Sequence, residues 1–151
     1  MLIYLGADHR GFNLKKSVSD FLRNKGYEVV DLGNQNYDEN DDYVDFAGEV
    51  AKKISADSEN RRGILICGSG VGVDIAANKF RGVRSALGIS ADQVYEARRD
   101  DDVNILSIAA DFTAESDAQK IIETFLETPF REEEKYRRRR DKLTQLEENL
   151  P

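Results

Sequence analysis

The sequence is poor in the residues that cross-link or stiffen a chain. It has one cysteine, one histidine, two prolines and no tryptophan among 151 residues. A single cysteine cannot form an intrachain disulfide, which suits a reducing cytosol better than secretion. No apolar run approaches the ~18 residues that a membrane-spanning helix needs, and the apolar start at residues 1–7 is too short for a signal peptide. We therefore expect a cytoplasmic protein without a membrane partner.

What is present suits one compact domain over residues 1–151. Apolar residues make up 40% of the chain and charged residues 34%. The chain can therefore form a single hydrophobic core, and it is not a low-complexity sequence. The formal net charge is −7, and since residues 131–142 carry +3, the rest carries −10. An acidic body of this kind disfavours nucleic-acid binding. The basic run at 137–140 could serve one small anion or could be a solvated helix face.

Short apolar runs alternate with amphipathic stretches along the whole chain. The pattern predicts strands at Leu2–Ala7, Tyr27–Leu32, Gly63–Cys67, Arg84–Gly88 and Asn104–Ala109. It predicts helices at Phe12–Lys25, Tyr43–Ser55, Val73–Lys79, Ala91–Arg99 and Ala114–Leu126, with a C-terminal helix at Glu132–Leu146. Such alternation indicates an α/β fold, a three-layer Rossmann-like sandwich with a five-stranded parallel sheet. We expect the strand order 2-1-3-4-5.

The residues that could take part in catalysis or ligand binding lie at the ends of two of these strands. Ligands of parallel sheets bind beyond the carboxyl ends of the strands, where the strand order reverses. With the expected order, that point lies between the first and third strands. Their ends carry the segments Gly6–Gly11 and Cys67–Gly72. The sequence therefore predicts a site at this crevice.

Cys67 ends an apolar strand and opens a glycine-rich turn. A thiolate there could act as a nucleophile or a general base, although a small buried cysteine that only fills core volume is the alternative. Gly68, Gly70 and Gly72 would let amide groups point at a bound anion, and Ser69 could add a hydroxyl or cap the next helix. The loop matches neither a Walker A motif nor a dinucleotide fingerprint.

Asp8 and His9 come at the end of the first strand. A lone histidine is more often structural than functional, but its place at a strand end favours a role. A cysteine hydrolase would need this histidine, yet the sequence around Cys67 lacks the strained nucleophile elbow. No His/Cys cluster has zinc spacing, and the acidic loop at 34–42 does not match a calcium-binding loop, so we expect no metal.

Longer stretches carry a family resemblance. The most specific is Gly63–Gly72, followed by Ile-Ala-Ala-Asn-Lys-Phe at 75–80. The turn Gly6–Phe12, the segment 42–47, and Thr-Pro-Phe at 128–130 before an arginine-rich helix extend the match almost from end to end. On these residues the sequence resembles the type B ribose-5-phosphate isomerase family, which includes the galactose-6-phosphate isomerase subunits.

The resemblance implies cofactor-free isomerisation of a pentose phosphate or related sugar through a cis-enediolate. It also implies a homodimer with sites between subunits, with a tetramer left open. Under this resemblance Cys67 is the proton-shuttling base, and the anion hole comprises Ser69 and the amides of Gly68, Gly70, Val71 and Gly72. The other substrate contacts it implies are Asp8, His9, Tyr43, Lys135 and Arg139.

Six positions depart from the family pattern, among them Tyr136 in place of a common histidine and Val44 in place of a common proline. The other four concern expected site residues. Asp100 and Asp101 stand where a ring-opening histidine and an asparagine are usual, Asp111 replaces a phosphate-binding arginine, and Lys135 replaces another arginine. If the three aspartates all face the pocket, its charge falls by about four units, which disfavours a phosphate dianion.

Two interpretations of these aspartates stay open. In the first, the substrate is altered: either Asp100 takes over ring opening, or the substrate is acyclic and needs none, and Asp101 and Asp111 contact it. In the second, all three aspartates turn to solvent or pair with Arg98, Arg99 or the arginines at 137–140. A different kind of function is also open: the protein could be a non-catalytic sugar-phosphate binder, or a subunit that requires a different partner chain.

Overall fold

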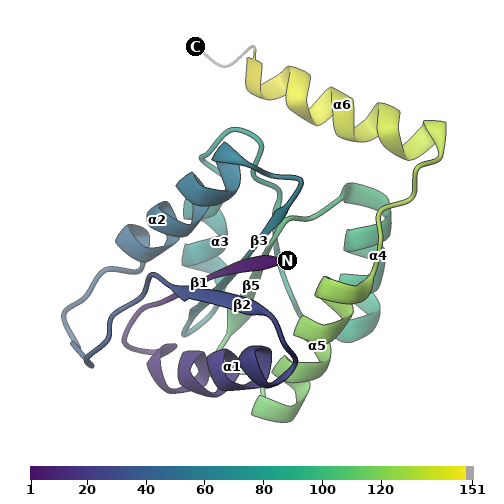
Figure 1. Cartoon of the computed structure of the whole chain (residues 1–151). Helices are drawn as coiled ribbons and strands as arrows, with labels where there is room; N and C mark the ends of the chain where they lie inside the picture. The colour runs from purple at the N-terminus through teal and green to yellow at the C-terminus, as the bar shows by residue number, and fades with distance from the viewer. Residues whose placement is uncertain (149–151) are drawn as a thin grey trace.

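The computed structural model describes residues 1–148, so the last three residues of the expected domain lie outside it. Five strands form one parallel sheet (Figure 1): β1 (Leu2–Ala7), β2 (Glu28–Asp31), β3 (Arg61–Cys67), β4 (Ser85–Leu87) and β5 (Ile105–Ala109). The helices are α1 (Phe12–Asn24), α2 (Tyr43–Ala56), α3 (Val71–Ala77), α4 (Ala91–Asp101), α5 (Glu115–Glu127) and α6 (Glu134–Glu148). The expected α/β fold class is confirmed.

The sheet separates two apolar clusters. Alternate residues of β1 and β3 point to opposite faces, so Ile3 and Ile64 join the cluster under α1, α4 and α5. Tyr4 and Leu65 face the other cluster, which α2 and α3 cover. Helices on both faces satisfy the burial that a parallel sheet requires. Within residues 1–148, no helix is long and apolar enough to cross a bilayer.

The order of the last two strands differs from our expectation. The sheet runs β2-β1-β3-β5-β4, so β5 pairs with β3, and β4 forms the edge. All five residues of β5 are buried, whereas the three residues of β4 are half-buried. An interior strand needs apolar side chains on both faces, and a short, partly polar strand is suited to an edge. The reversal of strand order between β1 and β3 is unaffected.

Helix α6 stands apart from the three layers. An extended segment after α5 leads to it, and it makes its packing contacts with α4 (Figure 1). Arg131 in this segment donates its backbone N–H to the carbonyl of Arg99, at 3.0 Å, near the end of α4. The arginine-rich helix is therefore anchored where α4 ends and β5 begins.

Candidate active site

Cys67 is the last residue of β3 and lies at the carboxyl edge of the sheet. Its side chain belongs to the apolar cluster beneath α2 and α3, and 4% of the residue is exposed. Two backbone hydrogen bonds tie this turn to the end of β5, from Ala110 N–H to the Cys67 carbonyl and from Asp111 N–H to the Gly68 carbonyl. The thiol is thus held at the edge of the core, directly before the glycine loop.

The glycine loop, residues 68–72, passes too close to its neighbours for side chains. Gly70 has a positive φ of 72°, and a Cβ there would come within 2.5 Å of Leu87 Cδ1. Such a conformation and such an approach both require glycine. Ser69 Oγ accepts a hydrogen bond from the Val71 N–H at 3.4 Å, across the start of α3. The loop therefore places its amides and one hydroxyl beside Cys67.

Asp8 fixes the turn between β1 and α1. Its Oδ1 accepts hydrogen bonds from the backbone N–H groups of Arg10 at 3.0 Å and Gly11 at 3.1 Å. A Cβ on Gly11 would come within 2.5 Å of the Ile66 carbonyl oxygen, so this turn lies directly against β3. Asp8 and Cys67 consequently end up at the same edge of the sheet, as the strand ends predicted.

His9 is bound to an aspartate in the loop before α2. Its Nδ1 lies 2.7 Å from Asp41 Oδ1, which also accepts the His9 backbone N–H at 2.9 Å. The hydrogen bond with Asp41 raises the pKa of His9 above its ordinary value of 6.5, and the charge of Asp8 acts in the same direction. His9 is therefore a cation over a wider pH range than a free histidine.

Two further side chains lie against the glycine loop. A Cβ on Gly72 would come within 2.8 Å of the Tyr43 ring, and a Cβ on Gly68 would come within 2.3 Å of the Arg10 guanidinium. Arg10 in turn forms a close ion pair with Asp111, which follows β5. The carboxylate of Asp111 thus has a cationic partner.

The other expected site residues lie at the opposite edge of the sheet. Asp100 and Asp101 are in the last turn of α4, which leads into the amino end of β5. Asp100 Oδ1 lies 3.3 Å from Arg131 Nε. Burial raises the pKa of the Asp101 carboxyl, the neighbouring Asp100 adds to this, and Arg139 on α6 opposes it. Lys135, four residues before Arg139, also lies on α6 and approaches the Tyr136 ring at 5.4 Å.

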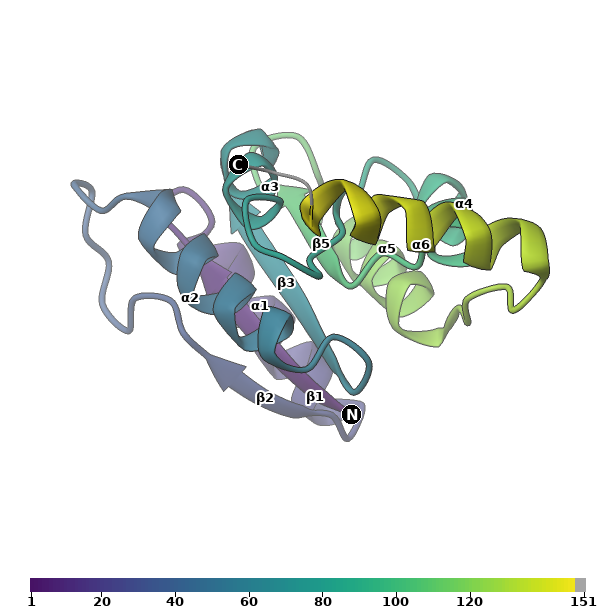
Figure 2. The same ribbon diagram turned by 90° about the horizontal axis from the view of Figure 1, so that it is seen from above.

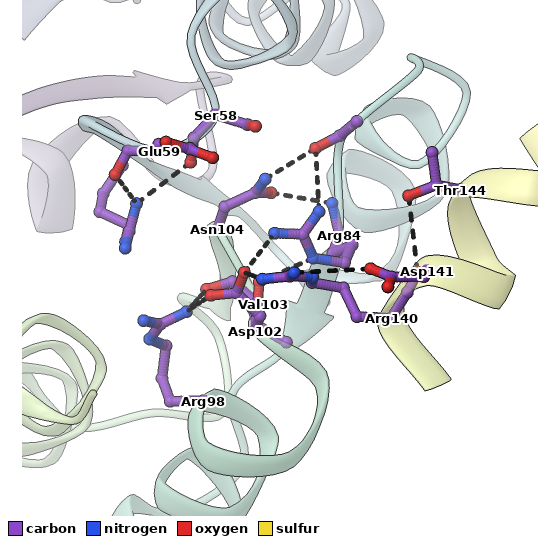
Figure 3. Close-up of polar contacts among 12 residues, drawn as sticks. Ser58, Glu59, Arg84, Arg98, Asp102, Val103, Asn104, Arg140, Asp141 and Thr144 are labelled. Atoms are coloured by element: carbon purple, nitrogen blue, oxygen red, sulfur yellow. Dashed lines mark hydrogen bonds and ion pairs between the residues drawn. The ribbon is translucent and has the colours of Figure 1, made fainter. Parts of the chain in front are cut away.

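An ion-pair cluster joins α6 to this amino edge. Figure 3 shows Arg84, Arg98 and Arg140 converging on Asp102, the residue that follows α4. The shortest nitrogen–oxygen distances are 2.8 Å for Arg84, 2.9 Å for Arg98 and 3.5 Å for Arg140. Burial lowers the pKa of the Arg84 guanidinium, and the charge of Asp102 acts against that effect. One carboxylate therefore balances several partly buried cations.

The structure thus divides the expected site into two groups. The carboxyl-edge group contains Asp8, His9, Tyr43, Cys67, the glycine loop and Asp111. The amino-edge group contains Asp100, Asp101, Lys135 and Arg139. The two groups are separated by the length of β5, whose five residues span roughly 16 Å at ~3.3 Å each.

The chain also holds site residues that we did not anticipate. Arg10, Asp41 and Arg131 contact expected site residues, and Asn34 contacts Asp41. Arg10 could have been suspected because it directly follows His9. Asp41 could not, because it is one of four acidic residues in a loop that looks uniformly solvated.

One trio of side chains has the spacing of a metal site. Within the described part of the chain, ligand atoms of Asp8, His9 and Asp41 lie within 4.8 Å of one another. However, Asp8 Oδ1 and Asp41 Oδ1 already accept backbone amides, and His9 Nδ1 is engaged with Asp41. The contacts present are those of a hydrogen-bonded network.

The fold and this edge define a parallel α/β protein with a thiol and an amide-lined loop at the reversal of strand order. The Ribose/Galactose Isomerase family model matches residues 3–143, and the chain belongs to this family. It is therefore an aldose–ketose isomerase of the ribose-5-phosphate isomerase B type.

Curated relatives agree with this assignment. The chain is 44% identical to a probable ribose-5-phosphate isomerase B of Mycoplasma genitalium, with 96% of this chain and 95% of the relative covered. It is 36% identical to ribose-5-phosphate isomerase B of Mycobacterium tuberculosis strain H37Rv, covering 97% and 90%. It is also 38% identical to a 4-deoxy-4-sulfo-D-erythrose isomerase of Clostridium sp. strain MSTE9, covering 87% and 82%.

Solved structures show the same fold. The crystal structure of the Mycoplasma genitalium isomerase B with bound ribulose-5-phosphate aligns with a TM-score of 0.95 at 43% identity, covering 99% of this chain and 97% of that one. The Clostridium thermocellum isomerase B aligns with a TM-score of 0.92 at 36% identity, covering 98% of each chain.

Proposed function

We propose that residues 1–151 form one cytoplasmic domain that interconverts ribose 5-phosphate and ribulose 5-phosphate without a cofactor. The observation that carries this proposal is the placement of Cys67 and its glycine loop beside Asp8 and Tyr43 at the reversal of strand order. The relative whose structure contains ribulose-5-phosphate is similar over nearly the whole chain, which supports a pentose phosphate as substrate.

The chemistry follows from what each group can do. The Cys67 thiolate removes the proton from C2 of the open-chain aldose, and the electron pair forms the C1–C2 double bond of a cis-enediolate. The hydroxyl proton of O2 passes to O1, and the same thiol delivers the carbon-bound proton to C1, which leaves the ketose with its carbonyl at C2. Ser69 and the amides of the loop stabilise negative oxygen that exists only near the transition state, so their interactions lower the barrier rather than the ground state.

The aspartate substitutions are locally balanced. Asp111 pairs with Arg10, Asp100 with Arg131, and Asp101 lies in the field of Arg139. For Asp100 and Asp111 these partners favour the interpretation in which the carboxylates pair with arginines, although Arg10 and Arg131 are different arginines from those we expected. For Asp101, burial and the neighbouring Asp100 raise the pKa, and Arg139 opposes them. A phosphate site built from His9, Lys135 and Arg139 is therefore compatible with the charges of the chain. In the other interpretation, Asp100 is released from Arg131 and takes over ring opening.

A second copy of the chain is needed to complete this site. His9 and Cys67 lie at one edge of the sheet and Lys135 and Arg139 at the other, so one substrate cannot touch both groups of the same copy. In a twofold dimer the carboxyl-edge group of one copy can face the amino-edge group of its partner. Val71 and Ile75, both on α3 beside the glycine loop, are exposed apolar residues that such an interface would cover.

Replacing the thiol tests the proposed function. Cys67→Ala is expected to lower kcat for ribose 5-phosphate by about 10²–10⁴-fold, because general acid–base groups contribute on that scale. KM and thermal stability should change little, since the side chain is small and does not bind the phosphate. The measurement is ketose formation from ribose 5-phosphate by wild type and variant. Wild-type turnover in the variant would overturn the role of Cys67.

One other substrate class is favoured by a specific observation. A relative at 38% identity is named for a sulfonate-bearing four-carbon sugar, and a sulfonate carries less charge than a phosphate dianion. The aspartates at 100, 101 and 111 would oppose it less. A wild-type kcat/KM that is higher for 4-deoxy-4-sulfo-D-erythrose than for ribose 5-phosphate would replace the proposed substrate. Binding of either sugar without turnover would instead support the non-catalytic binder.

A further inference from the structure

We infer that Asp41 and Asn34 are positioning residues for His9, holding its imidazole so that Nδ1 is engaged and Nε2 is left for an anionic substrate group. This inference rests on the proposed function, in which His9 contacts the phosphate. Neither residue is part of the family pattern on which the site was first predicted.

The direct contacts come from one carboxylate. Asp41 Oδ1 receives both the backbone N–H of His9, at 2.9 Å, and the imidazole Nδ1, at 2.7 Å. Its Oδ2 accepts a hydrogen bond from the Asn34 side-chain amide at 2.8 Å. The Asp41 side chain is 5% exposed, and that of His9 is 26% exposed. Because both carboxylate oxygens are engaged, Asp41 cannot turn to solvent without breaking this set of bonds.

The support continues into the protein interior. Lys15, whose side chain is 1% exposed, donates from Nζ to the Asn34 carbonyl at 2.7 Å and forms an ion pair with Asp31 at 2.9 Å. Asp31 also accepts the Gly33 N–H at 2.8 Å. The start of the loop between β2 and α2 is therefore fixed by a buried lysine. A continuous chain of contacts runs from Lys15 through Asn34 and Asp41 to His9.

The surroundings of His9 favour its charged form. Asp8 and Arg10 face it from the β1–α1 turn, and Asp41 and Tyr37 face it from the β2–α2 loop, with the Tyr37 ring edge-on at 6.3 Å. The hydrogen bond to Asp41 is the largest influence on the His9 pKa and raises it, while Arg10 opposes it. A protonated imidazole whose Nδ1 faces Asp41 presents Nε2–H as a charge-assisted donor, which suits a phosphate oxygen.

The contribution of His9 to stability and to phosphate affinity should depend on pH. Since the pKa of His9 is raised on folding, the stabilisation from its pairing is complete below the ordinary value of 6.5 and is lost as the pH rises through the folded value. The contribution of His9 to phosphate affinity should disappear over the same range. The affinity for a phosphorylated sugar should therefore decrease as the pH passes above the pKa of folded His9.

His9 is the single histidine of the chain, so one Hε1 signal reports its imidazole in an NMR titration. The wild-type pKa should lie above 6.5, and Asp41→Asn should move it down towards that value. At neutral pH the variant should show KM raised about tenfold with kcat nearly unchanged, since a charge-assisted contact is lost in ground and transition states alike. At a pH below the His9 pKa of both proteins, the difference in KM between wild type and variant should become smaller.

A matched control lies in the same loop. Asp38→Asn removes the same charge, but the exposed Asp38 side chain accepts the Asn40 backbone N–H at 3.0 Å and does not contact His9. The Asp38 backbone carbonyl, which accepts the Asp41 N–H, is kept in this variant, so the His9 titration and KM should stay as in wild type. Asn34→Ala is a milder variant that keeps both Asp41 oxygens available to His9, and a smaller shift in the same direction is expected. It keeps the test usable if Asp41→Asn does not fold.

Two results would overturn the inference. One is an unchanged His9 pKa in the folded Asp41→Asn variant, and the other is that Asp38→Asn and Asp41→Asn change the His9 pKa and KM equally. The titration and the binding of inorganic phosphate need no turnover. A wild-type protein that isomerises no sugar would therefore refute the proposed function, while the Asp41–His9 coupling could still be judged by these two measurements.

Discussion

Arg10 occupies the space beside Gly68 that a side chain at that position would fill, and its guanidinium pairs with Asp111 from the turn after β5. Both partners are partly exposed, with 56% of the Arg10 side chain and 35% of the Asp111 side chain accessible. A pair of this kind contributes little to folding, typically ~0–1 kcal/mol. Its importance is local, because without Arg10 an unpaired carboxylate would stand next to the glycine loop.

Removing one member of this pair should affect substrate affinity more than stability. Arg10→Gln exposes the Asp111 charge to an anionic sugar, and we expect KM for ribose 5-phosphate to rise about tenfold at low salt. The double variant Arg10→Gln with Asp111→Asn removes both charges and should recover most of that loss. The measurement is KM for the four proteins of the cycle, with melting temperatures as the check on folding. If the KM of the double variant is as high as that of Arg10→Gln alone, the proposed effect of the Asp111 charge is wrong.

At this scale the sequence predicted some positions and missed others for a physical reason. Cys67 and Asp8 were predictable because each follows an apolar strand, and strand ends meet at one edge. The partner of Asp111 was not, because Arg10 is 101 residues away and their meeting depends on side-chain directions. The role of Asp41 was hidden for the same reason.

Among the secondary-structure elements, the least regular junction is the one between α4 and β5. Asp102 has a positive φ of 52°, the sole such value outside glycine in the described residues. Three arginines contact its carboxylate, from α4, from the start of β4 and from α6. This residue therefore terminates α4 and also attaches α6 to the sheet.

Asp102→Asn separates the charge from the backbone conformation, since asparagine also tolerates the left-handed region. We expect it to lower the free energy of unfolding by about 3 kcal/mol, as loss of one partner leaves partly buried arginines unbalanced. Urea denaturation measures this. Asp141→Asn is the control, because Asp141 is exposed and approaches Arg140 only at 3.5 Å, and its effect should stay within ~0.5 kcal/mol. Equal effects would show that the arginine cluster does not depend on Asp102.

The same elements show why the strand order was predicted incorrectly. The pattern of apolar runs identified five strands and their helices, but the expected order placed the fourth strand inside the sheet and the fifth at its edge, the reverse of what the structure has. The difference lies in burial, because β5 is fully buried and β4 is only partly so. The sequence contains this difference only as the polar Ser85 in a three-residue strand, and that signal was too weak to assign the edge.

At the scale of the whole molecule, Figure 2 shows α6 on the side of the molecule where α4 lies, away from the outer end of α2, and α4 is the helix that it contacts. The helix carries Lys135 and Arg139, and its ion pairs hold it at the amino edge of its own sheet. The sequence indicated these two residues for phosphate binding through family resemblance alone. Their distance from Cys67 within one copy could not be predicted without the fold, and it is the physical reason for proposing a dimer.

Mixing two inactive variants tests whether the site is shared. One variant carries Cys67→Ala and the other carries Lys135→Ala with Arg139→Ala, and each alone should be nearly inactive at substrate concentrations well below KM. When the two are unfolded, mixed in equal amounts and refolded, activity should return to about one quarter of wild type, because half of the dimers combine both variants and each of these contains one complete site.

A site formed within a single copy of the chain predicts a different result. If Cys67 and the two cations served the same site from one copy, every site in the mixture would lack one or the other, and no activity would return. Each variant refolded by itself is the control for reversible folding, and size-exclusion chromatography reports whether dimers form. A dimer that gains no activity on mixing would refute the shared site while leaving the fold and the role of Cys67 intact.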